Sequence, residues 1–184
     1  MDCFIRTFDP LADPTYKLTK SDRLIMLRSG LTHSEFQFSA RYRGVSASAT
    51  MADKCRCVRF KMIDYSKHPE RWKTQVVHLS DAQEDAIIEE ARILADFNYL
   101  LGGERFSAWG AIYYGPAARK YDLAGVVVCN ILPCRLIRSN GKWYWCSEFV
   151  CHLIQVAYPD FNGHPDTQTP ETLYNEWEAY SNAA

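Results

Sequence analysis

The chain has 184 residues with a formal net charge of -1, and 47% of its residues are hydrophobic against 23% charged. This length and composition predict one domain, residues 1–184, large enough to bury a core. The near-neutral charge argues against a nucleic-acid-binding surface, and no apolar run reaches the roughly 18 residues of a membrane span, so we expect neither partner.

The N-terminus lacks a basic region followed by an apolar one, and therefore does not resemble a signal peptide. The seven cysteines are odd in number and have no disulfide-framework spacing. Reduced thiols in a cytoplasmic protein are the expectation. Delivery by a phage particle, by lysis or by a secretion machine is the open alternative.

In chain order, residues 1–20 read as loop and residues 22–27 as a short strand. Residues 33–38 alternate with the two-residue period of a half-exposed strand, and residues 45–50 alternate again after a plausible turn. These two segments predict a hairpin.

Pairing of Phe38 with Val45 would place His33 opposite Thr50 in that hairpin. A slip of one residue would invert the faces of a strand, so the pattern depends on this register. In this register one face of the hairpin is polar and comprises His33, Glu35, Gln37, Ser46, Ser48 and Thr50.

Two more strands are predicted at residues 57–63 and 74–79. Ser80, with Gln83 three residues later, forms a capping-box pattern at the start of a helix. The apolar stripe expected on that helix consists of Ala86, Ile87, Ala91, Leu94 and Phe97.

Residues 102–120 read as irregular, and residues 121–132 are ambiguous between helix and strand. A helix is predicted from Cys146 to Tyr158, before Pro159. The pair Thr169-Pro170 caps a last helix that continues to Tyr180. This succession of strands and helices predicts the α+β class.

Cys146 is the leading chemical candidate, because it stands at the predicted first turn of a helix. Free backbone N–H groups and the positive end of the helix dipole favour a thiolate there. The same N–H groups can stabilise an oxyanion during acyl transfer. The alternative is an inert buried cysteine, the usual state of a free thiol.

His33 is the candidate base for Cys146, since nucleophile and base are usually distant in sequence and close in space. Without Cys146, a plain surface histidine would be the better interpretation. A catalytic imidazole needs a partner for its second nitrogen. Glu35 is the first choice, as the charged group on that face, and Ser46, Ser48 and Thr50 stay open.

Metal binding is the main rival interpretation. The ligand types are present at Cys55 and Cys57, at Cys129 and Cys134, and at Cys151-His152. They lack the C-x2-C spacing of a structural zinc site, so we expect no metal and no cofactor. His152 lies six residues from Cys146 and well round the helix, which predicts a packing or capping role.

The residues before Cys146 are aromatic. Trp143, Tyr144 and Trp145 could line a substrate cleft, with core packing as the equal alternative. We retain Tyr144, Trp145 and the hairpin residue Ser48 as candidate substrate-binding residues.

With these residues in place, the chain resembles the circularly permuted branch of the NlpC-like, papain-type cysteine hydrolases, in which the histidine precedes the cysteine. The resembling segments are Asp22-Arg23-Leu24-Ile25, His33-Ser34-Glu35-Phe36-Gln37-Phe38, Ser46-Ala47-Ser48, Tyr121-Asp122-Leu123-Ala124-Gly125, Cys146-Ser147-Glu148-Phe149-Val150 and Thr169-Pro170-Glu171-Thr172-Leu173. The resemblance implies a small antiparallel sheet packed against the nucleophile helix. It also implies Cys146 as nucleophile, His33 as base and a polar third residue.

The expected function is therefore a thiol hydrolase that cleaves an amide or ester bond through an acyl-enzyme. A peptide, a peptidoglycan fragment or another acyl compound would be the substrate. Because one fold serves peptidases, amidases and acyltransferases, the fold does not select among them. The alternative is a non-catalytic papain-like module used for binding, or as a structural part of a virion or secretion system.

Overall fold

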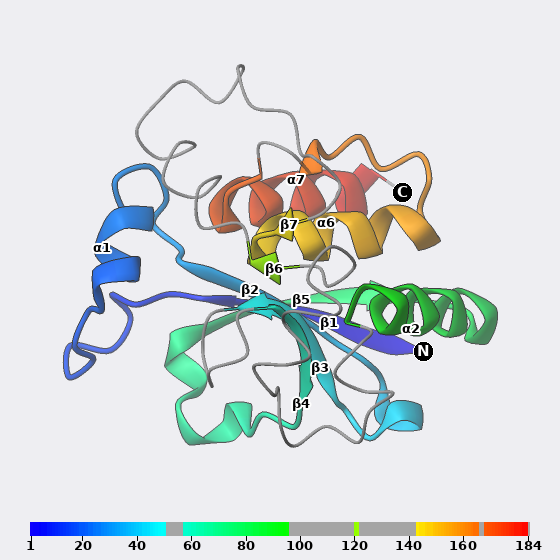
Figure 1. Cartoon of the computed structure of the whole chain (residues 1–184), viewed down its shortest axis with the longest axis horizontal. Helices are drawn as coiled ribbons and strands as arrows, with labels where there is room; N and C mark the ends of the chain where they lie inside the picture. The colour runs from blue at the N-terminus through cyan, green and yellow to red at the C-terminus, as the bar shows by residue number, and fades with distance from the viewer. Residues whose placement is uncertain (51–56, 96–119, 122–142, 166–167, 184) are drawn as a thin grey trace, which may run out of the picture.

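A computed structural model describes residues 1–50, 57–95, 120–121, 143–165 and 168–183 of the chain. Its centre is a sheet with strand order β5-β1-β2-β3-β4-β6-β7. The first five strands in this order are antiparallel, and helices pack against the sheet (Figure 1). The α+β class expected from the sequence is confirmed.

The N-terminal segment is a strand, β1 (Asp2–Phe8), and not the predicted loop. It lies inside the sheet, between β2 (His33–Gln37) and β5 (Trp72–His78). Cys3, Ile5 and Thr7 are fully buried while their neighbours are more exposed, which is the two-residue period of a strand. A cysteine and a threonine in the buried positions weaken the apolar pattern, which is why the segment reads as loop.

The hairpin of β2 and β3 (Ser46–Thr50) has the predicted register. Phe36 pairs with Ala47, and the backbone N–H of Phe38 donates to the carbonyl of Val45 at 2.9 Å. The turn between the strands contains the short 3-10 helix η1 (Ala40–Tyr42). The polar residues of both strands therefore share one face of the sheet.

The predicted strand at residues 22–27 is wrong, because this segment forms the helix α1 (Lys20–Ile25). Thr19 accepts the backbone N–H of Asp22 at 3.1 Å, and the carboxylate of Asp22 accepts the N–H of Thr19 at 2.8 Å. This reciprocal pair is a capping box that starts a helix. Asp22 stands in the position where glutamate is more usual, and the pattern is correspondingly easy to miss.

The remaining predicted elements keep their type, with shifted ends. The strands are β4 (Cys57–Lys61) and β5, and the helices are α2 (Asp81–Ala95), α6 (Cys146–Ala157) and α7 (Pro170–Ala183). The α2 capping box is present, since Ser80 accepts the N–H of Gln83 at 3.3 Å. In the predicted stripe, Ala86 is exposed and Ile88 is buried instead.

Short strands β6 (Lys120–Tyr121) and β7 (Trp143–Tyr144) complete the sheet. Phe97 and the predicted segment 102–120, except Lys120, lie outside the described residues, as does 121–132 except Tyr121.

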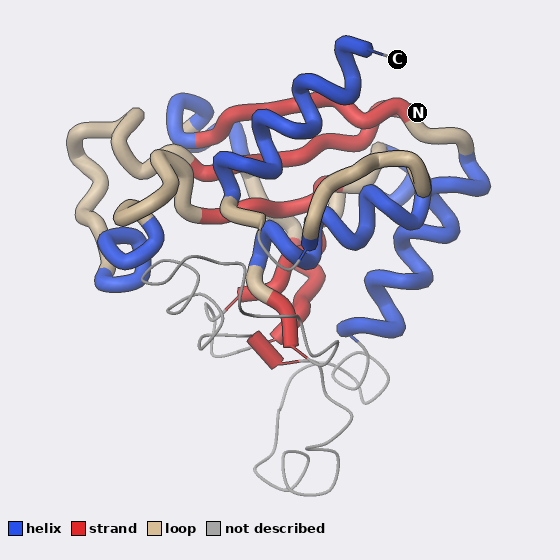
Figure 2. The backbone as a smooth tube through the Cα atoms, turned by 90° about the horizontal axis from the view of Figure 1, so that it is seen from above, coloured by secondary structure: helices blue, strands red, loops and turns tan. Residues whose placement is uncertain are grey.

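Helices α6 and α7 lie on one face of the sheet, and Figure 2 shows α7, the helix that ends at the C-terminus, running obliquely over the strands. α6 also packs against α2, so the core is the layer between the sheet and these helices. Its largest fully buried apolar side chains are Phe36, Phe38, Phe149, Ile5, Ile87, Leu153, Ile154 and Leu173.

Part of the other face of the sheet, around Glu35 and Ser46, lies against the segment between β4 and β5. This segment contains the 3-10 helices η3 (Tyr65–Lys67) and η4 (Pro69–Arg71), drawn in teal in Figure 1. Asp64 begins η3 by accepting the N–H of Ser66 at 3.1 Å. The polar residues of the β2–β3 hairpin face this segment.

None of the helices in the described part of the chain combines the length and the apolar composition needed to cross a bilayer.

Candidate active site

Cys146 is the first residue of α6, as the sequence predicts. The helix begins with half of a capping box, in which the carboxylate of Glu148 accepts the backbone N–H of Trp145 at 3.3 Å. The first-turn N–H groups of α6, which have no partner inside the helix, therefore surround the cysteine. Cys146 itself is only 2% exposed.

The chain on both sides of Cys146 is fixed to a single carbonyl group. The carbonyl oxygen of Gln168 accepts the indole N–H of Trp145 at 2.7 Å and the hydroxyl of Ser147 at 2.6 Å. Gln168 lies just before α7 and is itself buried. These two bonds hold the start of α6 against the start of α7, and so fix the position of the thiol.

His33 is the first residue of β2, and the thiol of Cys146 lies close enough to its imidazole to raise the pKa of the ring. The side chain of His33 is 23% exposed, which makes it the more accessible member of the pair. Burial by itself lowers the pKa of His33. The charge of Cys146, its hydrogen bond to the ring and the contact with Glu35 outweigh that effect and raise the pKa to about 10.

Glu35 holds the opposite side of the imidazole. Nε2 of His33 lies 3.0 Å from Oε1 of Glu35, which leaves Nδ1 as the ring nitrogen that can share a proton with Cys146. The Glu35 side chain is 3% exposed. The structure thus brings Cys146, His33 and Glu35, the three residues singled out from the sequence, into one cluster.

Two further donors hold the carboxylate of Glu35. Nη2 of Arg59 on β4 lies 3.2 Å from Oε1, and the hydroxyl of Tyr65 on η3 donates to Oε2 at 3.1 Å. Such charge-assisted hydrogen bonds are stronger than neutral ones, and inside a protein they are little weakened by water.

The hairpin hydroxyl groups have separate roles. Oγ of Ser48 lies 3.3 Å from Nε2 of His33 and donates to the carbonyl of Ser34 at 2.9 Å. Ser46 lies 2.7 Å from the hydroxyl of Tyr65, and Thr50 is buried at the end of β3. Among the four alternatives for the third residue, Glu35 and Ser48 therefore contact the imidazole, and Glu35 has the shorter contact.

The candidate substrate-binding residues have buried or undescribed side chains. Trp145 is 4% exposed and Ser48 1% exposed, which favours packing and positioning roles for both. The side chains of Trp143 and Tyr144 lie outside the described part of the structure, although their backbone forms β7.

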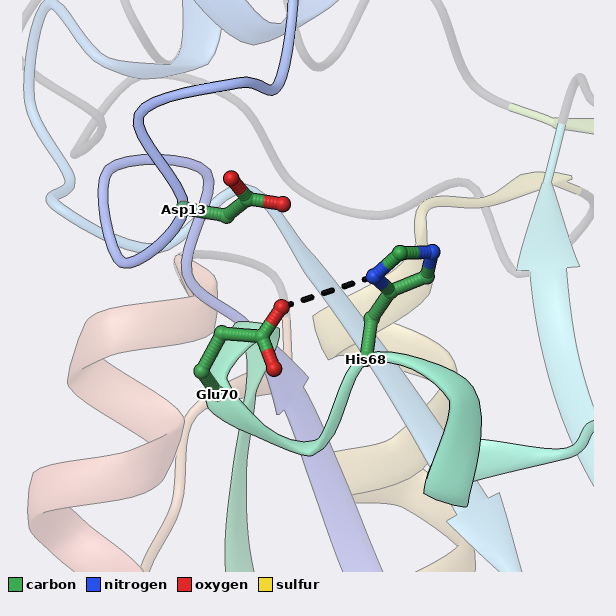
Figure 3. Close-up of side chains that lie close together, drawn as sticks. All are labelled: Asp13, His68 and Glu70. Carbon is green, nitrogen blue, oxygen red and sulfur yellow. Dashed lines mark ion pairs between the residues drawn. The ribbon is translucent and has the colours of Figure 1, made fainter.

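One group of side chains outside this site has metal-ligand chemistry. Ligand atoms of Asp13, His68 and Glu70 lie within 4.8 Å of one another (Figure 3). Oδ1 of Asp13 already accepts the N–H of Thr15 at 2.7 Å, and Oδ2 accepts Nε of Arg71 at 2.8 Å. A cation placed there would face the guanidinium of Arg71. The group is therefore better explained by the ion pair between Asp13 and Arg71, which joins the loop before α1 to η4.

The metal-ligand types considered from the sequence are not brought together in the described residues. Cys151 is buried in the core, and His152 pairs with Glu90 on α2 at 2.8 Å, in agreement with a packing role. Cys55, Cys129 and Cys134 lie outside the described residues, and only the backbone of Cys57 is described.

Sequence reasoning missed Arg59, Tyr65 and Gln168. Arg59 could have been found, because it pairs with Ser48 across β3 and β4 and so joins the polar face that the hairpin predicts. Tyr65 and Gln168 come from irregular segments and have no periodic pattern. Their contacts arise only from the tertiary fold.

Comparison of the chain with protein-family models, with curated proteins and with solved structures found no match.

Proposed function

We propose that this protein is a cysteine hydrolase that cleaves an amide or ester bond through an acyl-enzyme on Cys146. The proposal includes a circularly permuted, papain-like arrangement, in which the histidine strand β2 precedes the nucleophile helix α6 in sequence. The observation that carries it is the place of the His33 imidazole between Cys146, which raises the pKa of the ring, and Glu35, which lies 3.0 Å from Nε2. This is the nucleophile, base and orienting group of acyl-transfer enzymes.

The chemistry proceeds in two steps. The thiolate of Cys146 attacks the carbonyl carbon of the substrate, a C–S bond forms, and the oxyanion is held by first-turn N–H groups of α6. The C–N or C–O bond then breaks, and the protonated ring of His33 gives its proton to the leaving group. In the second step neutral His33 takes a proton from water, which attacks the thioester and releases the acid and the free thiol.

Two features support His33 as the proton carrier. An imidazole with a raised pKa is protonated at neutral pH, which favours the thiolate beside it and provides an acid for the leaving group. Glu35 binds Nε2, so Nδ1 is the ring nitrogen that can exchange a proton with the thiol. Amide and ester substrates both fit this mechanism, and peptides or peptidoglycan fragments are the candidate amides.

The test is covalent trapping with p-nitrophenyl acetate as a small activated ester. We expect one acetyl group on the peptide that contains Cys146, found by mass spectrometry after acid quench, and a burst of p-nitrophenolate. Cys146→Ala should abolish both, and His33→Ala should slow acetylation by at least about a hundredfold, as expected for loss of general acid–base catalysis. Cys151→Ala, which removes a buried cysteine of the same helix, should keep the acetylation if the protein folds.

A second candidate function is the non-catalytic papain-like module, and one observation favours it. Cys146 is only 2% exposed, whereas a nucleophile must meet its substrate. If the protein is such a module, acetylation will occur on exposed lysine or cysteine side chains and Cys146 will stay unmodified. The same experiment therefore separates the two candidates.

A further inference from the structure

Glu35 is bonded on both of its carboxylate oxygens, and the two sides differ. Oε1 is shared between Nε2 of His33 at 3.0 Å and Nη2 of Arg59 at 3.2 Å. Oε2 accepts the hydroxyl of Tyr65 at 3.1 Å. Tyr65 thus contacts the oxygen that neither the imidazole nor this guanidinium nitrogen uses.

Tyr65 is itself held firmly. Its ring packs edge-on against Trp72 with the centroids 4.9 Å apart, and the guanidinium of Arg6 lies 4.7 Å above its centre. Its hydroxyl lies 2.7 Å from Oγ of Ser46, so the serine can donate to the phenol while the phenol donates to Glu35. Burial, followed by the charge of Glu35, raises the pKa of Tyr65, and the phenol therefore keeps the proton it donates.

We propose that Tyr65 is a positioning residue for the reaction: it fixes Oε2 of Glu35 and thereby keeps Oε1 on the imidazole of His33. This inference rests on the proposed hydrolase function for its catalytic consequence. Its structural content, that Tyr65 controls the partner of His33, stands on the contacts alone.

The guanidinium of Arg59 competes with His33 for the carboxylate of Glu35, and this competition is why a positioning residue is needed. A guanidinium binds a carboxylate best through two parallel N–H bonds, one to each oxygen. If Oε2 were released, the carboxylate of Glu35 could turn to give Arg59 both oxygens and move away from His33. The bond from Tyr65 fixes the direction of Oε2, and in this orientation of the carboxylate Nη2 of Arg59 and the imidazole share Oε1.

The direct test follows the imidazole of His33 by NMR, in protein labelled at histidine, across a pH titration. Tyr65→Phe keeps the ring that packs on Trp72 and removes only the hydroxyl. We expect the midpoint of the His33 titration to fall, because the ring loses a carboxylate partner. The rate of Cys146 acetylation by p-nitrophenyl acetate should fall on the order of tenfold, the effect of losing one orienting hydrogen bond.

Tyr42→Phe is the matched control. Tyr42 also donates its hydroxyl to a carboxylate, that of Asp85, but at the turn end of the same hairpin, away from His33. It should leave both the His33 titration and the acetylation rate at their wild-type values. Loss of a phenol–carboxylate bond as such would affect both variants, whereas a positioning role affects only Tyr65→Phe.

Glu35→Gln tests whether Tyr65 acts through Glu35. This variant alone should lower the His33 midpoint and slow acetylation less than Cys146→Ala does, since an orienting group usually matters less than the nucleophile. Adding Tyr65→Phe to Glu35→Gln should then change neither quantity further, because interacting residues are not additive. A His33 titration unchanged in Tyr65→Phe, or full additivity with Glu35→Gln, would overturn the inference.

The two proposals fail in different ways. If wild-type Cys146 is not acetylated, the hydrolase proposal is wrong, and the His33 titration of Tyr65→Phe still decides whether Tyr65 controls Glu35. If acetylation occurs and Tyr65→Phe matches the wild type in rate and titration, the hydrolase proposal stands and the positioning role of Tyr65 does not.

Discussion

The proton on His33 is the central feature at the scale of single residues. Burial disfavours a charged imidazole, but the interactions of the ring with Cys146 and Glu35 outweigh that cost and raise its pKa. The folded-state pKa of about 10 lies above the ordinary 6.5, so the stabilisation from this charge is fully present below pH 6.5 and is lost as the pH rises toward 10.

A pH–rate profile follows from this. The breakdown of the tetrahedral intermediate of an amide needs the proton of His33, because an amine leaves poorly unless it is protonated. We therefore expect acylation of Cys146 by an amide substrate to decline as the pH rises through about 10. The measurement is p-nitroaniline release from a p-nitroanilide, with the rate of Cys146→Ala subtracted at each pH. A rate that continues to increase beyond that pH would indicate that His33 does not serve as the acid.

At the scale of elements, strong local patterns were readable from the sequence and weak ones were not. The β2–β3 hairpin could be predicted because Phe36 and Phe38 alternate with polar residues, and a slip of one residue would turn the polar side chains of one strand to the other face. β1 was missed because Cys3 and Thr7 occupy buried positions that usually carry larger apolar side chains. α1 was missed because its capping box ends in Asp22.

Some residues of the candidate site could likewise be predicted from local sequence, and others could not. Cys146 at a helix start, and His33 and Glu35 on a polar strand face, follow from local sequence. Tyr65 and Gln168 could not be predicted, since a single phenol or a single carbonyl in an irregular segment has no pattern, and its contact is decided by how distant segments pack.

The loop before α1 is tied to η4 by an ion pair, which predicts acid sensitivity. Hydrogen bonds from Thr15, followed by those of Arg71, lower the pKa of Asp13 from 3.8 to about 2. A group with a lowered folded-state pKa adds stability above its unfolded value and loses it as the pH falls. Wild-type protein should therefore be more stable than Asp13→Asn at neutral pH, and the difference should shrink between pH 3.8 and about 2.

Urea denaturation of both proteins at a series of pH values measures this difference. A gap in unfolding free energy that stays constant down to pH 2 would show that the Asp13 carboxylate has no special role in stability.

At the scale of the whole molecule, the sheet separates an apolar core on one face from a layer of polar side chains on the other. One face packs on α2, α6 and α7 and forms the apolar core, and the other carries the polar residues of the hairpin under η3 and η4 (Figure 1). His33 stands at the beginning of β2 and meets the N-terminus of α6. The candidate site thus combines a helix terminus on one side of the sheet with a hydrogen-bond network on the other.

A thiol hydrolase of this kind should contain no bound metal. A Cys–His acyl-transfer site needs no ion, and we expect elemental analysis of purified protein to find no stoichiometric zinc. EDTA should leave thermal unfolding unchanged, whereas a structural zinc site would lose folding energy on chelation. One zinc per chain with Cys55, Cys57 or Cys146 among its ligands would contradict the assignment as a thiol hydrolase.

The most direct test of the central claim, a reactive Cys146–His33 pair, is the pH dependence of alkylation by iodoacetamide, followed by peptide mass spectrometry at each cysteine. An ordinary thiol labels slowly below about pH 8.5, because the thiolate is the nucleophile. The account predicts that Cys146 labels at about pH 6 nearly as fast as at about pH 8, and that His33→Ala restores the ordinary steep rise with pH. A Cys146 rate that rises with pH like an ordinary thiol in wild-type protein, and is unchanged by His33→Ala, would contradict it.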